Sequence, residues 1–354
     1  MTATPIQQTC SRVWSWLAMA AVVFMAMGGM VPAWCQDLPT IKIFATGGTI
    51  ANTPDGRISV EAIIEALPDV LDIAELVAED ITRVGSSTLG WQELIDTAVA
   101  IQRTEEEEPD IDGYMVTIGS NAAEDIAYFL NLVVKTNKPL VVTAAQRQRE
   151  TLSEDASRNF IDALITAATP EAGGKGVLLV VNELIHPARE VTKNVVSRVD
   201  TWESLDTGAL GIISGGQAYF YRSPLRLHTM DSMFSIANLT AEDLPGTEIL
   251  YSYTDASPAL VKAAVNEANA KGLVIAAFGT ASAHGGQRPP LLEAAEDGVL
   301  IVLGNRGSSG RVADRGEPYI SADNLTPQKA NTLLKLALTV TNDRDEVQEI
   351  FYKY

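Results

Sequence analysis

Short apolar runs alternate with longer segments of helical spacing along the chain after Pro39. The short runs are bounded by glycine or proline, as expected of buried strands, and the longer segments carry apolar residues three and four positions apart, as in amphipathic helices. The pattern predicts strands at 41–45, 81–84, 114–118, 140–143 and 176–181, and helices at 60–67, 91–103, 122–133 and 154–168. The repeated strand–helix order predicts a parallel sheet with right-handed crossovers.

The alternation lapses between 223 and 246, where prolines and serines gather, and this stretch is predicted to link two domains. A second set follows, with strands at 249–253, 273–277 and 300–303, and helices at 258–270, 291–296, 327–341 and 344–354. Pro327 suits a first helical turn, with Thr326 as its cap. We therefore expect an α/β fold with a larger N-terminal domain at 37–222, a linker at 223–246 and a smaller C-terminal domain at 247–354.

Composition narrows the class of protein. The chain has 354 residues, of which 46% are hydrophobic and 20% are charged, which suits a globular protein with a sizeable core. Its formal net charge of −19 would repel nucleic acid and an anionic membrane surface, so neither is expected as a partner. The acidic run 105–108, closed by Pro109, predicts a solvated helix end.

Residues 1–36 have the pattern of an export signal. Arg12 precedes an apolar run from 13 to 30 that only Ser15 interrupts, and small residues near Ala33 suit a cleavage site. We expect a periplasmic or secreted protein; the length of the run also allows an uncleaved membrane anchor, and a lipoprotein through Cys35 is disfavoured by Trp34. Cleavage would remove Cys10, the only other cysteine, so no internal disulfide is expected.

The first strand ends in the turn Thr46–Gly47–Gly48–Thr49. Ligands of open α/β sheets bind at the carboxyl ends of the strands, and the two glycines allow a ligand to approach the backbone closely. The hydroxyl of Thr49 is therefore a candidate nucleophile. Alternatively, the threonines only cap a helix or satisfy the backbone of the turn. A phosphate-binding or dinucleotide site is disfavoured because no GxGxxG or GxxxxGK[ST] accompanies the glycines.

The heptapeptide ATGGTIA at 45–51 resembles the first signature of the bacterial asparaginase and glutaminase family, and the similarity extends in order over nearly all of the chain after the signal. The resemblance implies that Thr49 attacks a side-chain carboxamide. RVGSSTL at 83–89 resembles the family segment that binds the substrate's α-carboxylate, which implies that Ser86, with its neighbour Ser87, contacts substrate. By themselves, these serines indicate only a turn rich in hydroxyls.

TIGSNAAEDIAYFL at 117–130 resembles the second family signature but departs from it. Ser120 corresponds to the second catalytic threonine and keeps a hydroxyl. Asn121 corresponds to an aspartate that, in the family, pairs with the substrate's α-ammonium and with a lysine, so the resemblance implies a substrate-binding position without its charge. Ile118 replaces a histidine and can serve only for packing.

REVTKNV at 189–195 resembles the segment that supplies the family's lysine, which implies Lys193 as the third catalytic residue. A lysine acts as a base when burial lowers its pKa. Because Asn121 carries no charge, we hypothesise that Lys193 is more easily deprotonated here than beside a carboxylate.

Further departures concern the enclosure of the site. The family's lid carries a tyrosine, but this chain has only the compact turn 52–57 before the next helix, so an open site is expected. An asparagine that the neighbouring family subunit contributes corresponds to about Ser282. His186, His228 and His284 match neither metal-ligand spacing nor a Ser–His arrangement, and no metal or cofactor is expected.

The sequence therefore predicts an exported amidohydrolase that hydrolyses asparagine or glutamine through Thr49, Ser120 and Lys193. An amide without a free α-ammonium is an alternative substrate, and a periplasmic amino-acid-binding homologue with little activity is an alternative function. The resemblance also implies a homotetramer.

Overall fold

The computed structural model describes residues 38–237 and 239–354, so the predicted export signal lies outside the described residues. Within the described part of the chain, no helix is long and apolar enough to cross a membrane.

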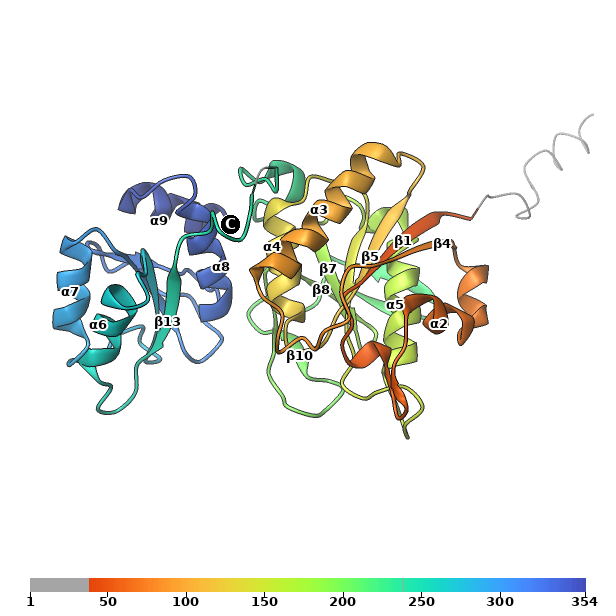
Figure 1. Cartoon of the computed structure of the whole chain (residues 1–354), viewed down its shortest axis with the longest axis horizontal. Helices are drawn as coiled ribbons and strands as arrows, with labels where there is room; N and C mark the ends of the chain where they lie inside the picture. Colours follow the sequence, from red (N-terminus) through yellow and green to blue (C-terminus); the bar gives the residue numbers. More distant parts are fainter. Residues whose placement is uncertain (1–37, 238) are drawn as a thin grey trace, which may run out of the picture. The chain divides into compact units, whose positions relative to one another are not determined.

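An eight-stranded sheet occupies the centre of the N-terminal half (Figure 1). Its strand order is β12-β11-β8-β7-β6-β5-β1-β4. The strands from β7 to β4 run parallel, whereas β8, β11 and β12 pair antiparallel. The sheet comprises β1 (Thr40–Ala45), β4 (Glu75–Asp80), β5 (Gly113–Thr117), β6 (Leu140–Thr143), β7 (Val177–Val181), β8 (Leu184–Pro187), β11 (Gly211–Ser214) and β12 (Gln217–Phe220).

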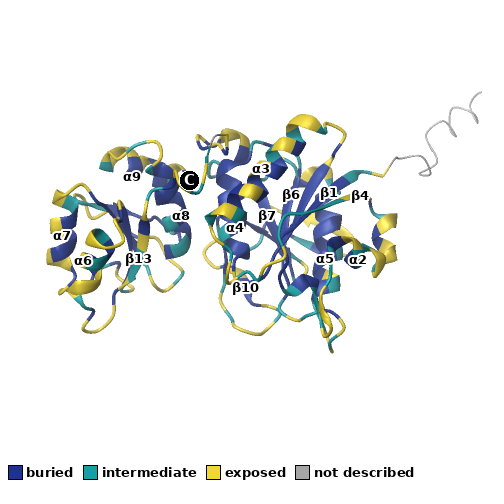
Figure 2. Ribbon diagram, viewed as in Figure 1, coloured by how far each residue is buried: buried dark blue, intermediate teal, exposed yellow. Residues whose placement is uncertain are grey.

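Helices cover both faces of this sheet because alternate side chains of a strand point to opposite faces. In β1, Ile41 and Ile43 pack with one buried cluster and Phe44 with the other. Figure 2 shows the central strands largely in the colour of buried residues. Helices α2 (Val60–Glu65) and α5 (Ala156–Ala167) contribute to the first cluster, and α3 (Trp91–Glu107) and α4 (Ala123–Val133) contribute to the second. Near-continuous burial of the central strands is typical of a parallel sheet between two helical layers.

The C-terminal half contains a second, fully parallel sheet in the order β13-β14-β15-β16. Helices α6 and α7 contribute to one buried cluster, while α8 shares its core with α4 of the first half. The predicted two-domain α/β fold is therefore confirmed. The elements are β13 (Thr247–Tyr251), β14 (Gly272–Ala277), β15 (Leu300–Asn305), β16 (Tyr319–Ser321), α6 (Pro258–Asn266), α7 (Arg288–Glu296), α8 (Pro327–Ala337) and α9 (Arg344–Lys353).

The strand expected at 81–84 is wrong, because the second strand to pair with β1 is β4, which precedes it. Three of its six residues are acidic, which concealed it from a search for apolar runs. Its position at the edge of the sheet tolerates these charges, and Glu79 lies 3.3 Å from the Lys42 ammonium. After Asp80 the chain leaves the sheet.

Other differences are local. The apolar pattern did not indicate the short strands β8, β9 (Val191–Lys193), β10 (Trp202–Ser204), β11, β12 and β16. Thr326 occupies the predicted capping position, but among the residues that the structure describes its hydroxyl finds no capping partner. The acidic run is not wholly solvated: Lys42 donates a 2.6 Å hydrogen bond to Glu108. The compact turn after Ala51 is confirmed as a hairpin of β2 (Asn52–Thr53) and β3 (Gly56–Arg57).

Candidate active site

Three loops meet where neighbouring strands β4, β1 and β5 end. Gly47 and Gly48 adopt φ angles of 85° and 89°, a region that favours glycine. A Cβ at Gly48 would lie 2.1 Å from the backbone nitrogen of Gly119, and one at Gly47 would lie 2.8 Å from the carbonyl oxygen of Val84. The turn after β1 therefore packs directly against the loops after β4 and β5, and no side chain fits between them.

Ser86 lies at the same junction. A Cβ at Gly119 would lie 2.3 Å from Ser86 Oγ, so this serine rests on the backbone that leads to Ser120. Ser86 is half-buried, and its neighbour Ser87 is exposed. The structure thus brings Ser86 beside the loop that carries Ser120 and places Ser87 at the surface.

The two threonines of the turn have different environments. Thr46 is buried, and both its backbone N–H and its hydroxyl donate to the carbonyl of Thr117, at 2.9 and 3.0 Å. Thr49 is half-buried at the start of a 3-10 helix, Thr49–Ala51, and among the described residues its hydroxyl makes no hydrogen bond. A role in satisfying the backbone therefore fits Thr46, whereas the hydroxyl of Thr49 remains available.

Lys193 and Ser120 are in direct contact although 73 positions separate them. The Lys193 ammonium donates to Ser120 Oγ at 2.8 Å, and it lies 3.5 Å from Oδ1 of the exposed Asn121. Lys193 ends the short strand β9 (Val191–Lys193), which pairs with β10 (Trp202–Ser204). Partial burial lowers the pKa of Lys193, and the charge of Glu124 opposes that shift. The position therefore favours a lysine that can exchange a proton with a neighbouring hydroxyl.

The segment that leads into β9 is held by the C-terminal half of the chain. Lys329 of α8 is buried, and its ammonium donates to the carbonyl oxygens of Ala188 at 2.8 Å, of Arg189 at 3.0 Å, and of Val191. Burial lowers the pKa of Lys329 to about 8. Sequence reasoning missed this residue, because a lysine on a helix is usually exposed and only the fold buries this one.

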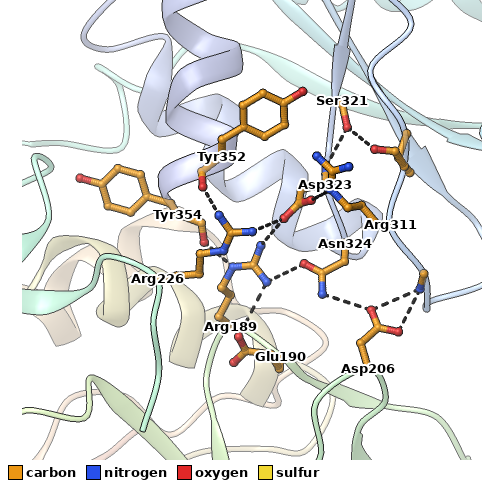
Figure 3. Close-up of polar contacts among 12 residues, drawn as sticks. Arg189, Glu190, Asp206, Arg226, Arg311, Ser321, Asp323, Asn324, Tyr352 and Tyr354 are labelled. Atoms are coloured by element: carbon orange, nitrogen blue, oxygen red, sulfur yellow. Dashed lines mark hydrogen bonds and ion pairs between the residues drawn. The ribbon is translucent and has the colours of Figure 1, made fainter.

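Arg189 adds a second connection between the halves (Figure 3). Its guanidinium donates to Asn324 Oδ1 at 2.7 Å, lies 3.4 Å from Asp323 Oδ2, and also donates to the carbonyl of Tyr354. Asp323 accepts further hydrogen bonds from Arg226 at 2.6 Å and Arg311 at 2.7 Å. These contacts, with those of Lys329, fix the backbone just before Lys193.

A pocket of about 490 Å³ lies beside this arginine cluster rather than at the loop junction. Arg189, Arg226 and Asp323 line it, but Thr49 and Lys193 do not. Its arginines already hydrogen-bond to carboxylates and carbonyls, so we locate the candidate active site from the converging loops instead.

The histidines lie outside the loop junction. His186 is buried, and its Nδ1 lies 3.0 Å from Oγ of the equally buried Ser204, so the pair is closed to substrate. Burial lowers the pKa of His186 to about 4. Ser282 follows β14, and no described contact joins it to Lys193 within the chain. Among the described residues, no group of three His, Cys, Asp or Glu side chains could hold a metal ion.

Comparison with known proteins gives the class and then the family. The family model described as "Asparaginase, N-terminal" matches residues 40–226, and "Glutaminase/Asparaginase C-terminal domain" matches residues 247–351. With the two-sheet fold, these matches define an amidohydrolase of the asparaginase type.

Individual relatives indicate the same family as the two family models. "L-asparaginase 2" of Bacillus subtilis is 39% identical over 90% of this chain and 88% of its own length, and "L-asparaginase 2" of Escherichia coli is 35% identical over 95% and 98%. A crystal structure of a probable cytoplasmic L-asparaginase from Campylobacter jejuni superposes with a TM-score of 0.85 at 36% identity, over 89% of this chain and all of the other. The chain belongs to the asparaginase and glutaminase family.

Proposed function

We propose that this protein hydrolyses the side-chain carboxamide of asparagine or glutamine through a covalent intermediate on Thr49. The names of the relatives support this substrate class. The observation that carries the site is the 2.8 Å contact between Lys193 and Ser120, on the loop against which the Gly48–Thr49 turn packs.

In the proposed reaction the hydroxyl oxygen of Thr49 attacks the carboxamide carbon. Lys193, acting through Ser120, accepts the hydroxyl proton and passes a proton to the leaving nitrogen, so that ammonia departs and an acyl ester remains. Backbone N–H groups near Ser120 stabilise the oxyanion. Water then adds to the ester, releases the carboxylic acid and restores the Thr49 hydroxyl. Burial lowers the pKa of Lys193 and so favours its role as a base.

Ammonia release from asparagine and glutamine tests the nucleophile. Thr49→Val should lower kcat by about 1,000-fold or more, because the nucleophilic oxygen is lost. Thr53→Val is the matched control, since Thr53 lies in the adjoining hairpin and, among the described residues, its hydroxyl donates only to Gly56 O. Full activity in Thr49→Val would exclude the proposed nucleophile. Inactivity of the wild-type chain, with retained ligand binding, would favour the alternative of an amino-acid-binding homologue.

We further propose export and tetramer formation. The apolar pattern of residues 13–30 supports a periplasmic or secreted location, which N-terminal sequencing of the mature protein would test. The expected homotetramer can be measured by light scattering, and a monomer at assay concentration would contradict it.

A further inference from the structure

The candidate active site holds a cation without a contacting carboxylate. Lys193 donates to a hydroxyl and lies near the neutral amide oxygen of Asn121. Among the described residues, no acidic side chain forms an ion pair with it within 4.0 Å. The charge of Glu124 acts on the pKa of Lys193. Glu124 is buried in the first turn of α4, where a substrate at the loop junction would not displace it.

A substrate ammonium beside Lys193 would therefore meet the neutral amide of Asn121 and no contacting carboxylate. An amide oxygen offers a cation far less stabilisation than a carboxylate does, whether or not Lys193 carries its proton. Asn121 Oδ1 is moreover already oriented toward Lys193. The site thus disfavours a positively charged group beside the reacting amide.

A second cation lies on a loop joined to the Thr49 segment. Arg149, in the loop after β6, is 6% exposed, and its backbone N–H donates to the carbonyl of Asn52 at 3.0 Å. Its Nη1 is buried and has no hydrogen-bond partner among the described residues, and the same holds for Nε2 of Gln146 on that loop. Buried donors without partners are costly, so they are expected to find one in the liganded protein.

Among the described residues, none of the three acidic groups of the same loop, Glu150, Glu154 and Asp155, forms an ion pair with Arg149. Asp155 accepts from the backbone N–H groups of Gln146 and Arg147, and from Asn159 Nδ2 at 3.1 Å. These hydrogen bonds hold the loop in its conformation. Within the described part of the chain Arg149 forms no ion pair, so its guanidinium remains an uncompensated charge on the loop that is joined to Asn52.

We propose that, given the hydrolysis assigned above, this protein prefers carboxamides that carry a carboxylate and no ammonium, such as the monoamides of four- and five-carbon dicarboxylic acids. Succinamate is the simplest example. Water adds to its acyl ester, the C–N bond having broken earlier, and the products are succinate and ammonium. Asn121 is the specificity-determining residue against an ammonium, and Arg149 strengthens recognition of the anion.

Three amides separate the two effects. Succinamate and asparagine differ by an ammonium, while succinamate and the neutral diamide succinamide differ by a carboxylate. The wild-type kcat/KM should be at least about tenfold higher for succinamate than for asparagine, the size expected of one uncompensated charge contact. Asn121→Asp should shift this ratio toward asparagine by about tenfold or more, because it supplies the missing anion.

Arg149→Gln should lower the ratio of succinamate to succinamide by about tenfold. Arg147→Gln is its matched control, because Arg147 is exposed on the same loop and donates to Ser153 O, and it should leave that ratio within about twofold. Calorimetry on Thr49→Val, with succinate and L-aspartate as probes, reads the same preference without turnover, and succinate should bind more tightly.

The outcomes distinguish this inference from the function on which it rests. If wild-type protein hydrolyses none of the three amides, the proposed hydrolysis itself fails. If asparagine is hydrolysed as well as succinamate or better, hydrolysis stands and the substrate preference is overturned. An unchanged asparagine ratio in Asn121→Asp would also overturn the role of position 121.

Discussion

The Lys329 ammonium lies 2.8 Å from the backbone carbonyl oxygen of Ala188, although 141 positions separate the two residues. With its bonds to the carbonyls of Arg189 and Val191, this contact ties a helix of the C-terminal half to the strand that ends in Lys193. A buried ammonium with three carbonyl acceptors is well satisfied, so its removal leaves those acceptors without their partner. The position of Lys193 therefore depends on a residue outside the sheet that carries the site.

Lys329→Met should lower both stability and turnover. Methionine keeps most of the volume but donates no hydrogen bond, so the free energy of unfolding should fall by about 3 kcal/mol. Urea denaturation measures this loss. Because Lys329→Met releases the β9 backbone, kcat should fall by a larger factor than the factor by which KM changes. Steady-state kinetics would show this difference.

Lys335→Met, on the same helix, is the matched control. Lys335 is also buried, but within the described part of the chain it donates to a single carbonyl, that of Pro245, at 2.5 Å. Lys335→Met should lower the free energy of unfolding by less than Lys329→Met does, and it should leave kcat unchanged. Equal kinetic losses in the two variants would argue against a positioning role for Lys329.

The close approach of Gly48 to Gly119 gives a second prediction. Gly48→Ala places a methyl group 2.1 Å from the Gly119 nitrogen, so the turn and the loop must separate and the hydroxyl of Thr49 must move. Activity should fall by about 100-fold or more, since reacting groups misplaced by an ångström lose that much. Ammonia release, with circular dichroism to verify folding, is the measurement.

Gly310→Ala separates crowding from backbone strain. Gly310 has a φ of 94°, close to that of Gly48, but no described residue lies within 4 Å of an added Cβ. Gly310→Ala should lower the free energy of unfolding by about 1 kcal/mol and leave activity unchanged. Comparable activity in the two alanine variants would show that the contact between the loops is not required.

Whether an element could be predicted from the sequence depends on the range of the interactions that form it. The strand at 41–45 and its glycine turn were predictable, because apolar residues and turn residues are local signals. The β4 strand was not, because its acidic residues are accommodated by an edge position and by ion pairs with Lys42 on β1, with Arg83 and with Arg103. Edge position is a property of the assembled sheet.

The residues of the candidate site also fall into those with local sequence signals and those that only the fold reveals. Thr49, Ser86, Ser120 and Lys193 could be selected through short motifs, and the structure brings Ser120 and Lys193 into contact and rests Ser86 on Gly119. The unpartnered Arg149 and the anchoring Lys329 could not be selected, because a lysine or arginine in sequence is usually exposed, and only the fold buries these two.

The neutral side chain at position 121 makes the pKa of Lys193 sensitive to substitution. Asn121→Asp introduces a carboxylate near the ammonium, which stabilises the charged form and raises the pKa of Lys193. If deprotonated Lys193 is the base, the acidic limb of the kcat/KM profile should move to higher pH by about one unit. Asn121→Ser removes the amide without adding charge and should produce no upward shift. A stationary limb in the aspartate variant would show that Lys193 is not the titrating base.

The buried His186 predicts how stability depends on pH. Burial lowers the pKa of His186 from 6.5 to about 4, so between these values the unfolded chain binds a proton that the folded protein does not. The stabilisation is therefore fully present above pH 6.5 and is lost as the pH falls toward 4, amounting to about 3 kcal/mol. Asp125 acts in the opposite direction, because burial raises its pKa to about 7 and folding then favours the protonated carboxyl.

The contribution of His186 must accordingly be measured as a difference. The free energy of unfolding of wild-type protein minus that of His186→Gln should decrease by about 3 kcal/mol between pH 7 and pH 4, because the effect of Asp125 cancels in the subtraction. Urea titrations at half-unit pH intervals provide this difference. A difference that is constant with pH would mean that the imidazole binds its proton equally well in the folded and unfolded states, which the burial of both His186 and Ser204 argues against.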